Sequence, residues 1–183
     1  MSRRGGRRRW PLAAVGVVVA LVLAVAAIGY FLPVAHVASV AATIPAPPES
    51  VWTAVASPAT YDRWHPGVSR VDVLPPVNGR PSWRETSGDG TITYVAEASE
   101  PPRRFVARIA DHDLPFGGTW EYRLAPEGTG TRVTVTERGE VYNPIFRFVS
   151  RFVVGHTKTL TDYLKALGRR FGSEAAPAVV TAP

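Results

Sequence analysis

The sequence lacks cysteine altogether over its 183 residues. This absence excludes disulfide bonds, thiolate catalysis and zinc sites built from cysteine. The sequence also lacks a nucleophile elbow, a phosphate-binding loop, a dinucleotide fingerprint and a zinc-protease helix, and it has no internal repeat. Because no strong catalytic motif is present, we expect binding rather than catalysis.

Net positive charge is small outside the N-terminus. The formal net charge is +6, and Arg3, Arg4, Arg7, Arg8 and Arg9 lie together before the first apolar run. The rest of the chain is therefore nearly neutral, whereas a nucleic-acid-binding domain carries basic residues across a folded face. We predict no nucleic acid partner. The Asp111-His112-Asp113 stretch is interpreted as a polar loop rather than a metal site, and no cofactor is predicted.

Charged residues are absent from Pro11 to Leu32. A helix rises about 1.5 Å per residue, so this run is long enough to cross a hydrocarbon core about 30 Å thick. Trp10 and Tyr30 are placed at its two ends, where aromatic side chains favour the headgroup regions. We predict a basic cytoplasmic tail over 1–10, a transmembrane helix over 11–32 and an extracytoplasmic domain, because arginines favour the cytoplasmic side.

A cleaved signal peptide is the alternative interpretation of this segment. A small-residue cleavage site is present at Ser39-Val40-Ala41. The apolar region of a signal peptide is usually about 7–15 residues, which is shorter than this one. Cleavage there would also cut into the first predicted strand, 36–44. We therefore favour a single-pass anchor.

The remainder of the chain indicates one α+β domain over 36–172. A strand is followed by two short helices that begin at Pro47-Pro48 and Ser57-Pro58, and then by alternating segments separated by turns such as Gly88-Asp89-Gly90. No βαβ spacing occurs, so the sheet should be antiparallel. The tail over 173–183 is small and proline-containing, and we expect it to be disordered.

The last element is predicted as one long amphipathic helix from Pro144 to about Phe171. Its apolar residues recur at steps of three and four, which places them on one face: Ile145, Phe148, Val149, Phe152, His156, Leu160, Tyr163, Leu164 and Leu167. We expect Phe152 and Leu160 to be buried against the sheet, and Arg151 and Lys158 to be exposed.

Several local patterns, in this order and spacing, are similar to those of the START-like (SRPBCC, polyketide-cyclase-like) superfamily. They are Ile44-x-Ala46-Pro47-x-Glu49-x-Val51-Trp52, Trp64-His65-Pro66-Gly67-Val68, Gly130-Thr131-Arg132-Val133-Thr134 and Tyr163-Leu164-x-x-Leu167. The resemblance implies a helix-grip fold, in which a curved antiparallel sheet wraps around a long C-terminal helix. It also implies a cavity between helix and sheet that binds lipids, sterols, polyketides or hormones.

Five residues are candidates for lining such a cavity: Trp83, Tyr94, Trp120, Glu137 and His156. Aromatic residues that alternate along strands are more often ordinary core, and the two interpretations overlap because a cavity in this fold forms within the core. Glu137 and His156 fall on otherwise apolar faces, where a polar group needs a partner such as Arg108, a ligand or a bound proton. The alternative interpretation of His156 is a core histidine bonded to its neighbours, and that of Glu137 is a solvated strand end.

The leading hypothesis is a membrane-anchored binder or carrier of a hydrophobic small molecule, lipid or polyketide-like. The alternative is an enzyme of the polyketide cyclase or dehydratase type, in which Glu137 and His156 exchange protons with the substrate. A third possibility is an interaction domain with a filled core.

Overall fold

The computed structural model describes residues 9–88 and 90–182, with side chains from residue 11 onward. Most of the predicted basic tail, together with Asp89 in the predicted turn, lies outside the described residues. The described chain divides into two compact units. A helical unit comprises the N-terminal segment up to Val34 together with Val141–Gly155, and a sheet domain comprises Ala35–Glu140 and His156–Pro183.

The helical unit is built around α1 (Arg9–Phe31), within which Pro11–Phe31 is long and apolar enough to cross a membrane. It also contains α3 (Pro144–Val149) and one turn of π-helix, η2 (Ser150–Val154). Asn143 caps α3, because its side-chain Oδ1 accepts hydrogen bonds from the backbone N–H groups of Ile145 and Phe146 at 2.9 and 3.2 Å.

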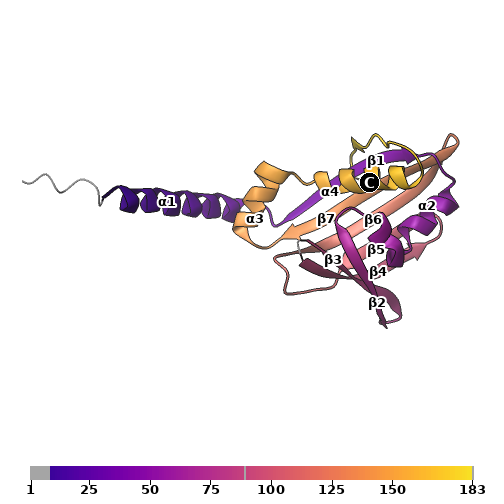
Figure 1. The fold of residues 1–183 in the computed structure, drawn as a ribbon, viewed down its shortest axis with the longest axis horizontal. Coiled ribbons are helices and arrows are strands. Elements are labelled where there is room, and N and C mark those ends of the chain that lie inside the picture. The colour runs from indigo at the N-terminus through magenta and orange to yellow at the C-terminus, as the bar shows by residue number, and fades with distance from the viewer. Residues whose placement is uncertain (1–8, 89, 183) are drawn as a thin grey trace, which may run out of the picture. The chain divides into compact units, whose positions relative to one another are not determined.

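The sheet domain contains eight strands in the part of the chain that the structure describes, in the order β2-β3-β4-β5-β6-β7-β1-β8. The sheet is antiparallel and curved (Figure 1). Its strands are β1 (Ala35–Ile44), β2 (Val68–Val77), β3 (Arg80–Ser87), β4 (Gly90–Glu100), β5 (Arg104–Ile109), β6 (Phe116–Glu127), β7 (Gly130–Val141) and β8 (Ala178–Val179). The predicted fold class is therefore confirmed.

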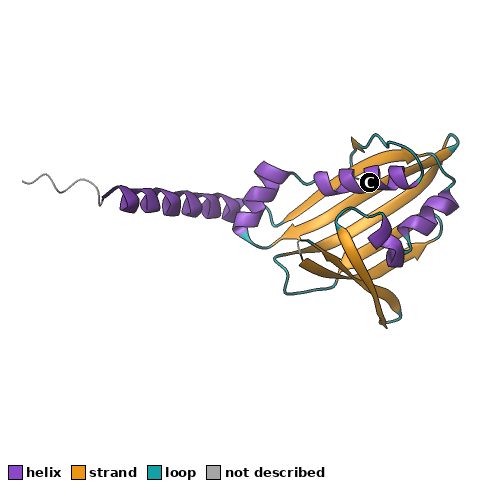
Figure 2. Ribbon diagram, in the orientation of Figure 1, coloured by secondary structure: helices purple, strands orange, loops and turns teal. Residues whose placement is uncertain are grey.

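Three helical elements complete this domain: α2 (Pro48–Val55), the 3₁₀ segment η1 (Pro58–Arg63) and α4 (Lys158–Arg170). Helices α2 and α4 lie against one face of the sheet, called here the inner face (Figure 2). Leu160, Tyr163, Leu164 and Leu167 of α4 are fully buried there. Arg169 and Arg170 end the helix, where their charge is favourable to its dipole.

The prediction of one continuous helix from Pro144 to Phe171 is wrong. The helical path ends at Gly155, which has a φ of 78°, and helical structure resumes only at Lys158. Glycine adopts this left-handed conformation without the steric cost that other residues meet. As a result Leu160 is buried as expected, whereas Phe152 is 60% exposed and belongs to the helical unit.

The tail also differs from its predicted disorder. Ala178 and Val179 pair with Ala41 and Val40 of β1, and the backbone N–H of Val180 donates to the carbonyl of Ser39 at 3.0 Å. Ala175 is buried against the hydrophobic core. Small residues permit this close return of the chain, so their abundance here reflects packing rather than disorder.

Candidate functional site

The inner face of the sheet is covered by α4 at one end only. Beneath the helix, Phe105, Tyr122, Val133 and Val135 are buried. Beyond it, the same face carries side chains that are only half-buried: His36, Glu85, Tyr94, Trp120 and Glu137. Because the helical path breaks at Gly155, no residue of α4 precedes Lys158 to cover this end. We call these five residues the open end of the inner face.

A histidine–glutamate group lies at one side of the open end. The His36 Nε2 atom of β1 is 3.4 Å from the Glu137 Oε1 atom of β7. The ring of His156, in the loop before α4, stacks on His36 with 3.8 Å between ring centroids. Glu137 lies on the same strand face as buried Val133 and Val135. The sheet and the segment before α4 therefore contribute to one polar group.

Gly139 makes the position of His36 possible. A Cβ atom at Gly139 would lie 2.6 Å from His36 Nε2 and 2.9 Å from Glu137 Oε1. Such distances are far below van der Waals contact, so a side chain at this position would displace the imidazole or the carboxylate. Gly139 of β7 is the residue that pairs with His36 of β1. Because Gly139 has no side chain, the imidazole ring of His36 can lie over it on the inner face.

An aromatic–carboxylate group lies at the other side. Trp83 and Tyr94 are cross-strand partners whose rings stack at 5.5 Å. The indole Nε1 of Trp83 donates a hydrogen bond of 2.7 Å to Glu85 Oε1. Burial raises the pKa of the Glu85 carboxyl, and the hydrogen bond from Trp83 opposes this shift without cancelling it. Glu85 therefore holds a proton more readily than an exposed glutamate does.

The Tyr94 hydroxyl interacts with carboxylates of both groups, Glu85 and Glu137. Burial raises the pKa of its hydroxyl, and the charges of Glu85, Glu137 and Asp111 raise that pKa further. The side chain is nevertheless partly reachable by water. The hydroxyl therefore stays neutral and can both donate and accept a hydrogen bond.

A set of tyrosines continues this interior beneath α4. Tyr61 donates a hydrogen bond to the carbonyl of Val55, and Tyr122 and Tyr163 pack with 5.2 Å between ring centroids. Among the described residues, no partner meets hydrogen-bond geometry at the Tyr163 hydroxyl, although the Tyr61 and Tyr122 hydroxyls interact with it electrostatically. Burial raises the pKa of all three tyrosines. The interior beneath α4 is therefore aromatic, and its hydroxyl groups remain neutral.

The structure distributes the five predicted residues over these groups. Trp83 and Tyr94 are in contact, and Glu137 and His156 meet through His36. Trp120 is apart from both pairs and packs on Tyr122 and Tyr163 at 6.2 and 6.1 Å. Arg108, the partner considered for Glu137, instead forms an ion pair with Glu97.

Sequence reasoning missed His36 and Glu85. His36 is separated by an even number of residues from the buried Val40 and Ala42 of β1, and this spacing would have placed it on the same, inner face. Glu85 shares a strand face with Trp83, but only the structure shows that Glu85 is partly buried. No local signal marked Tyr61, whose importance depends on contacts made across the fold.

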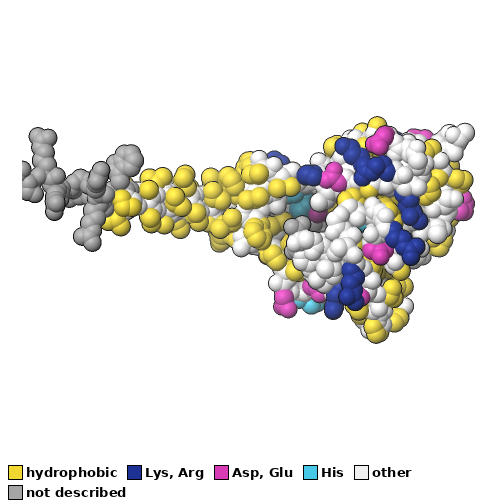
Figure 3. Space-filling view, viewed as in Figure 1, with side chains coloured by type: hydrophobic (Ala, Val, Ile, Leu, Met, Phe, Trp, Pro, Cys, Tyr) yellow, Lys and Arg dark blue, Asp and Glu magenta, His cyan; other side chains and the backbone are white. Residues whose placement is uncertain are grey.

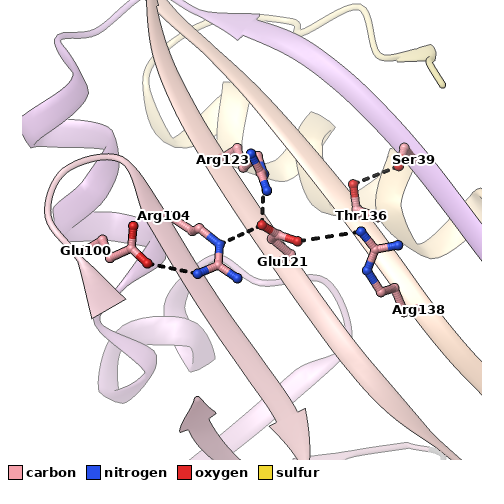
Figure 4. Close-up of polar contacts among 7 residues, drawn as sticks. All are labelled: Ser39, Glu100, Arg104, Glu121, Arg123, Thr136 and Arg138. Carbon is pink, nitrogen blue, oxygen red and sulfur yellow. Dashed lines mark hydrogen bonds and ion pairs between the residues drawn. The ribbon is translucent and has the colours of Figure 1, made fainter. Parts of the chain in front are cut away.

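The outer face of the same sheet carries a different kind of carboxylate (Figure 4). Glu121 is 6% exposed, and its Oε1 accepts hydrogen bonds from the Nε atoms of Arg104 and Arg123 at 2.7 and 2.8 Å. Arg138 lies 3.9 Å from its other oxygen. Burial alone would raise the pKa of Glu121, but the two hydrogen-bonded arginines hold it below its ordinary value.

No cluster of three or more histidine, aspartate or glutamate side chains suited to a metal ion occurs in the described ranges. Asp111, in the predicted polar loop, accepts a hydrogen bond of 2.6 Å from the backbone N–H of Thr93. This contact ties the loop to β4.

Comparison with solved structures supports the fold. A START superfamily protein from Mycobacterium smegmatis is similar with a TM-score of 0.61 and 19% identity, over 75% of this chain and 97% of that one. The ZhuI aromatase/cyclase from Streptomyces sp. R1128 is similar with a TM-score of 0.60 and 14% identity, over 75% and 94% of the two chains.

The di-domain aromatase/cyclase StfQ of the steffimycin biosynthetic pathway is similar with a TM-score of 0.61 and 13% identity. The matched region is 76% of this chain and 52% of StfQ, so this chain spans about half the length of that protein. Identities at this level show a shared fold and nothing further. No curated protein sequence matches this chain.

A match at the level of sequence families is more specific. The profile described as "Polyketide cyclase / dehydrase and lipid transport" matches residues 35–172, which begins with β1, ends just after α4 and includes the whole inner face. The chain therefore belongs to the polyketide cyclase/dehydrase and lipid transport family.

Proposed function

We propose that this protein binds a hydrophobic small molecule, lipid or polyketide-like, at the open end of the inner face, while α1 anchors it to a membrane. The observation that carries the proposal is the incomplete cover of the inner face. Tyr94 and Trp120 offer partly exposed aromatic surface, behind which Trp83 is buried, and His36, Glu137 and His156 offer polar contacts. Mostly aromatic sites with a few polar groups are typical of small-molecule binding.

The anchor part of the proposal rests on α1 and on β1. Cleavage at Ser39-Val40-Ala41 would remove the first part of β1, which pairs with β7 from Ala35 to Ile44. Val40 is fully buried, so its loss would open the core. An uncleaved helix avoids this damage. We expect the protein to fractionate with membranes, and added protease to digest the sheet domain only from the extracytoplasmic side.

A second candidate function is acid–base catalysis on a polyketide substrate. It is favoured by the contact of His36 with Glu137, because an imidazole beside a carboxylate can accept and return a proton near neutral pH. Aromatase/cyclase proteins are among the structures that share this fold. In this alternative Glu137 orients His36, and His156 stacks on the same ring.

The experiment is a ligand titration beside a turnover assay, on the wild type and on His156→Phe and Glu137→Gln. The probe is 8-anilinonaphthalene-1-sulfonate, which is fluorescent in apolar sites, and turnover is followed on a polyketide substrate. For a binder, His156→Phe should weaken binding about tenfold, which corresponds to about 1.4 kcal/mol. For an enzyme, binding should persist while turnover falls by about 10²–10⁴-fold.

His112→Phe and Glu140→Gln are the matched controls, because both positions are exposed. Both should leave binding and turnover unchanged. If the site variants behave as these controls do while the fold is preserved, the open end is a structural feature and the proposal is wrong.

A further inference from the structure

The helical unit holds a short apolar segment against the end of α1. A Cβ atom at Gly29, which is buried, would overlap with the carbonyl oxygen of Pro144. Only glycine permits this approach, so the first turn of α3 is seated directly on the last turns of α1. The contact belongs to a single compact unit, since both segments are part of it.

Arg147 adds hydrogen bonds to this contact between α3 and α1. Its Nη1 atom donates hydrogen bonds to the carbonyls of Leu32 and Tyr30 at 2.9 and 3.3 Å, and its Nη2 donates to the carbonyl of Tyr142 at 3.2 Å. The last carbonyls of a helix have no partner within the helix, and a cation there is favourable to the helix dipole. Arg147 therefore fixes α3 at the level of the end of α1.

That level is set by the length of α1. The apolar part, Pro11–Phe31, has 21 residues, and apolar side chains cover the face of it seen in Figure 3. A helix of this length spans about 30 Å, the thickness of the hydrocarbon core. If α1 crosses a bilayer, Tyr30 and the attached α3 lie at the boundary between acyl chains and headgroups.

The segment 144–154 leaves large apolar side chains exposed at this level: Ile145 at 38%, Phe146 at 48%, Phe152 at 60%, Val153 at 71% and Val154 at 51%. Arg151, among them, is exposed as well. Contiguous apolar side chains in contact with water are unusual in soluble domains. Aromatic and aliphatic side chains with an interspersed arginine are typical of segments that lie in a membrane interface.

We propose that segment 144–154 is a second membrane contact, which lies in the interface of the bilayer that α1 spans and holds the chain there. This inference rests on the anchoring role of α1 in the proposed function. The occupant of the apolar surface is lipid rather than a second copy of the chain, because the surface is continuous with the end of a helix whose own surroundings are lipid.

The test uses the full-length chain, whose lack of cysteine permits a single label at a chosen position. Val153→Cys is labelled with an environment-sensitive nitrobenzoxadiazole dye and reconstituted in phosphatidylcholine vesicles that contain phosphatidylglycerol. The matched control is Val73→Cys, because Val73 and Val153 are both 71% exposed and Val73 belongs to β2 of the sheet domain. Val18→Cys, 59% exposed within α1, reports on anchoring.

The label at 153 should be quenched several-fold more strongly by lipids that carry a shallow nitroxide than the label at 73, and the label at 18 should be quenched by deep nitroxides. Equal behaviour at 153 and 73, with quenching retained at 18, would overturn the interfacial segment alone. Protection at 153 from aqueous iodide without quenching by lipid would mean a protein contact, and would also overturn it. Absence of lipid quenching at 18 would overturn the anchor itself.

Discussion

Glu121 and Glu85, which lie on opposite faces of the sheet, have opposite electrostatic environments. On the outer face, Glu121 is surrounded by Arg104, Arg123 and Arg138, and its charge is compensated within the fold. On the inner face, Glu85 has only the indole N–H of Trp83 as a hydrogen-bond partner in the described structure, and its pKa is raised. The comparison teaches that a carboxylate paired with arginines indicates a structural role, whereas a partly buried carboxylate without a cationic partner is a candidate site for a proton or a ligand.

The largest expected effect concerns the covered end of the inner face. Leu160→Ala should lower the free energy of unfolding by about 2–5 kcal/mol, because Leu160 is fully buried under α4. Phe152→Ala is the control from the same predicted stripe, and should cost less than about 1 kcal/mol because Phe152 is exposed. Chemical denaturation in detergent measures both. Equal costs would show that the inner face and the segment before Gly155 share one core.

The next effect concerns the compensated carboxylate. Glu121→Ala should lower the free energy of unfolding by about 2 kcal/mol, because three arginines would then lie close together without their common partner. This loss is smaller than that expected for a fully buried ion pair, because the arginines are partly hydrated. Glu100→Ala, whose side chain is 60% exposed and pairs with the same Arg104, should cost less than about 0.5 kcal/mol. Denaturation curves that do not separate these two variants would contradict the structural role of Glu121.

The smallest effect is a pair of opposite pH dependences. Because the pKa of Glu121 is lowered by folding, its contribution to stability is present above the unfolded value of about 4.3 and is lost as the pH falls through the folded value. Because the pKa of Glu85 is raised, its contribution is present below about 4.3 and is lost as the pH rises through the folded value.

The free energy of unfolding, measured from about pH 3 to about pH 7, should therefore distinguish the two variants. Glu121→Gln should remove part of the loss of stability on acidification, and Glu85→Gln part of the loss on raising the pH above about 4.3. If the difference in unfolding free energy between variant and wild type changed with pH in the same direction for both substitutions, the contrast between Glu121 and Glu85 would be contradicted.

The fold was accessible from the sequence because its signals are local. Alternation in β6 and β7 and the apolar positions of α4 each follow from residues close in the chain. The break at Gly155 was missed because a periodicity of three and four residues continues across it from Phe152 to His156 and Leu160. Periodicity shows which residues share a face but not where the backbone turns.

The candidate site was less accessible because its contacts are distant in the chain. Glu137 was placed on an inner face by alternation, but its partner His36 is about a hundred residues away, and no pattern near either one indicates the pairing. The environment of Glu85 likewise depends on its hydrogen bond from Trp83 and on its partial burial by the folded domain. These residues remain predictions as ligand contacts.

The short strand β8 has a consequence for how this protein is handled. It supplies hydrogen-bonding partners to β1 on the side away from β7. Without it, the middle of β1 would present free N–H and C=O groups to any extended peptide, and such sheet edges promote aggregation. A tag fused closely to the C-terminus, or a truncation at Gly172, would uncover that edge, so loss of solubility in such variants would reflect unintended strand pairing between molecules rather than failure of the domain to fold.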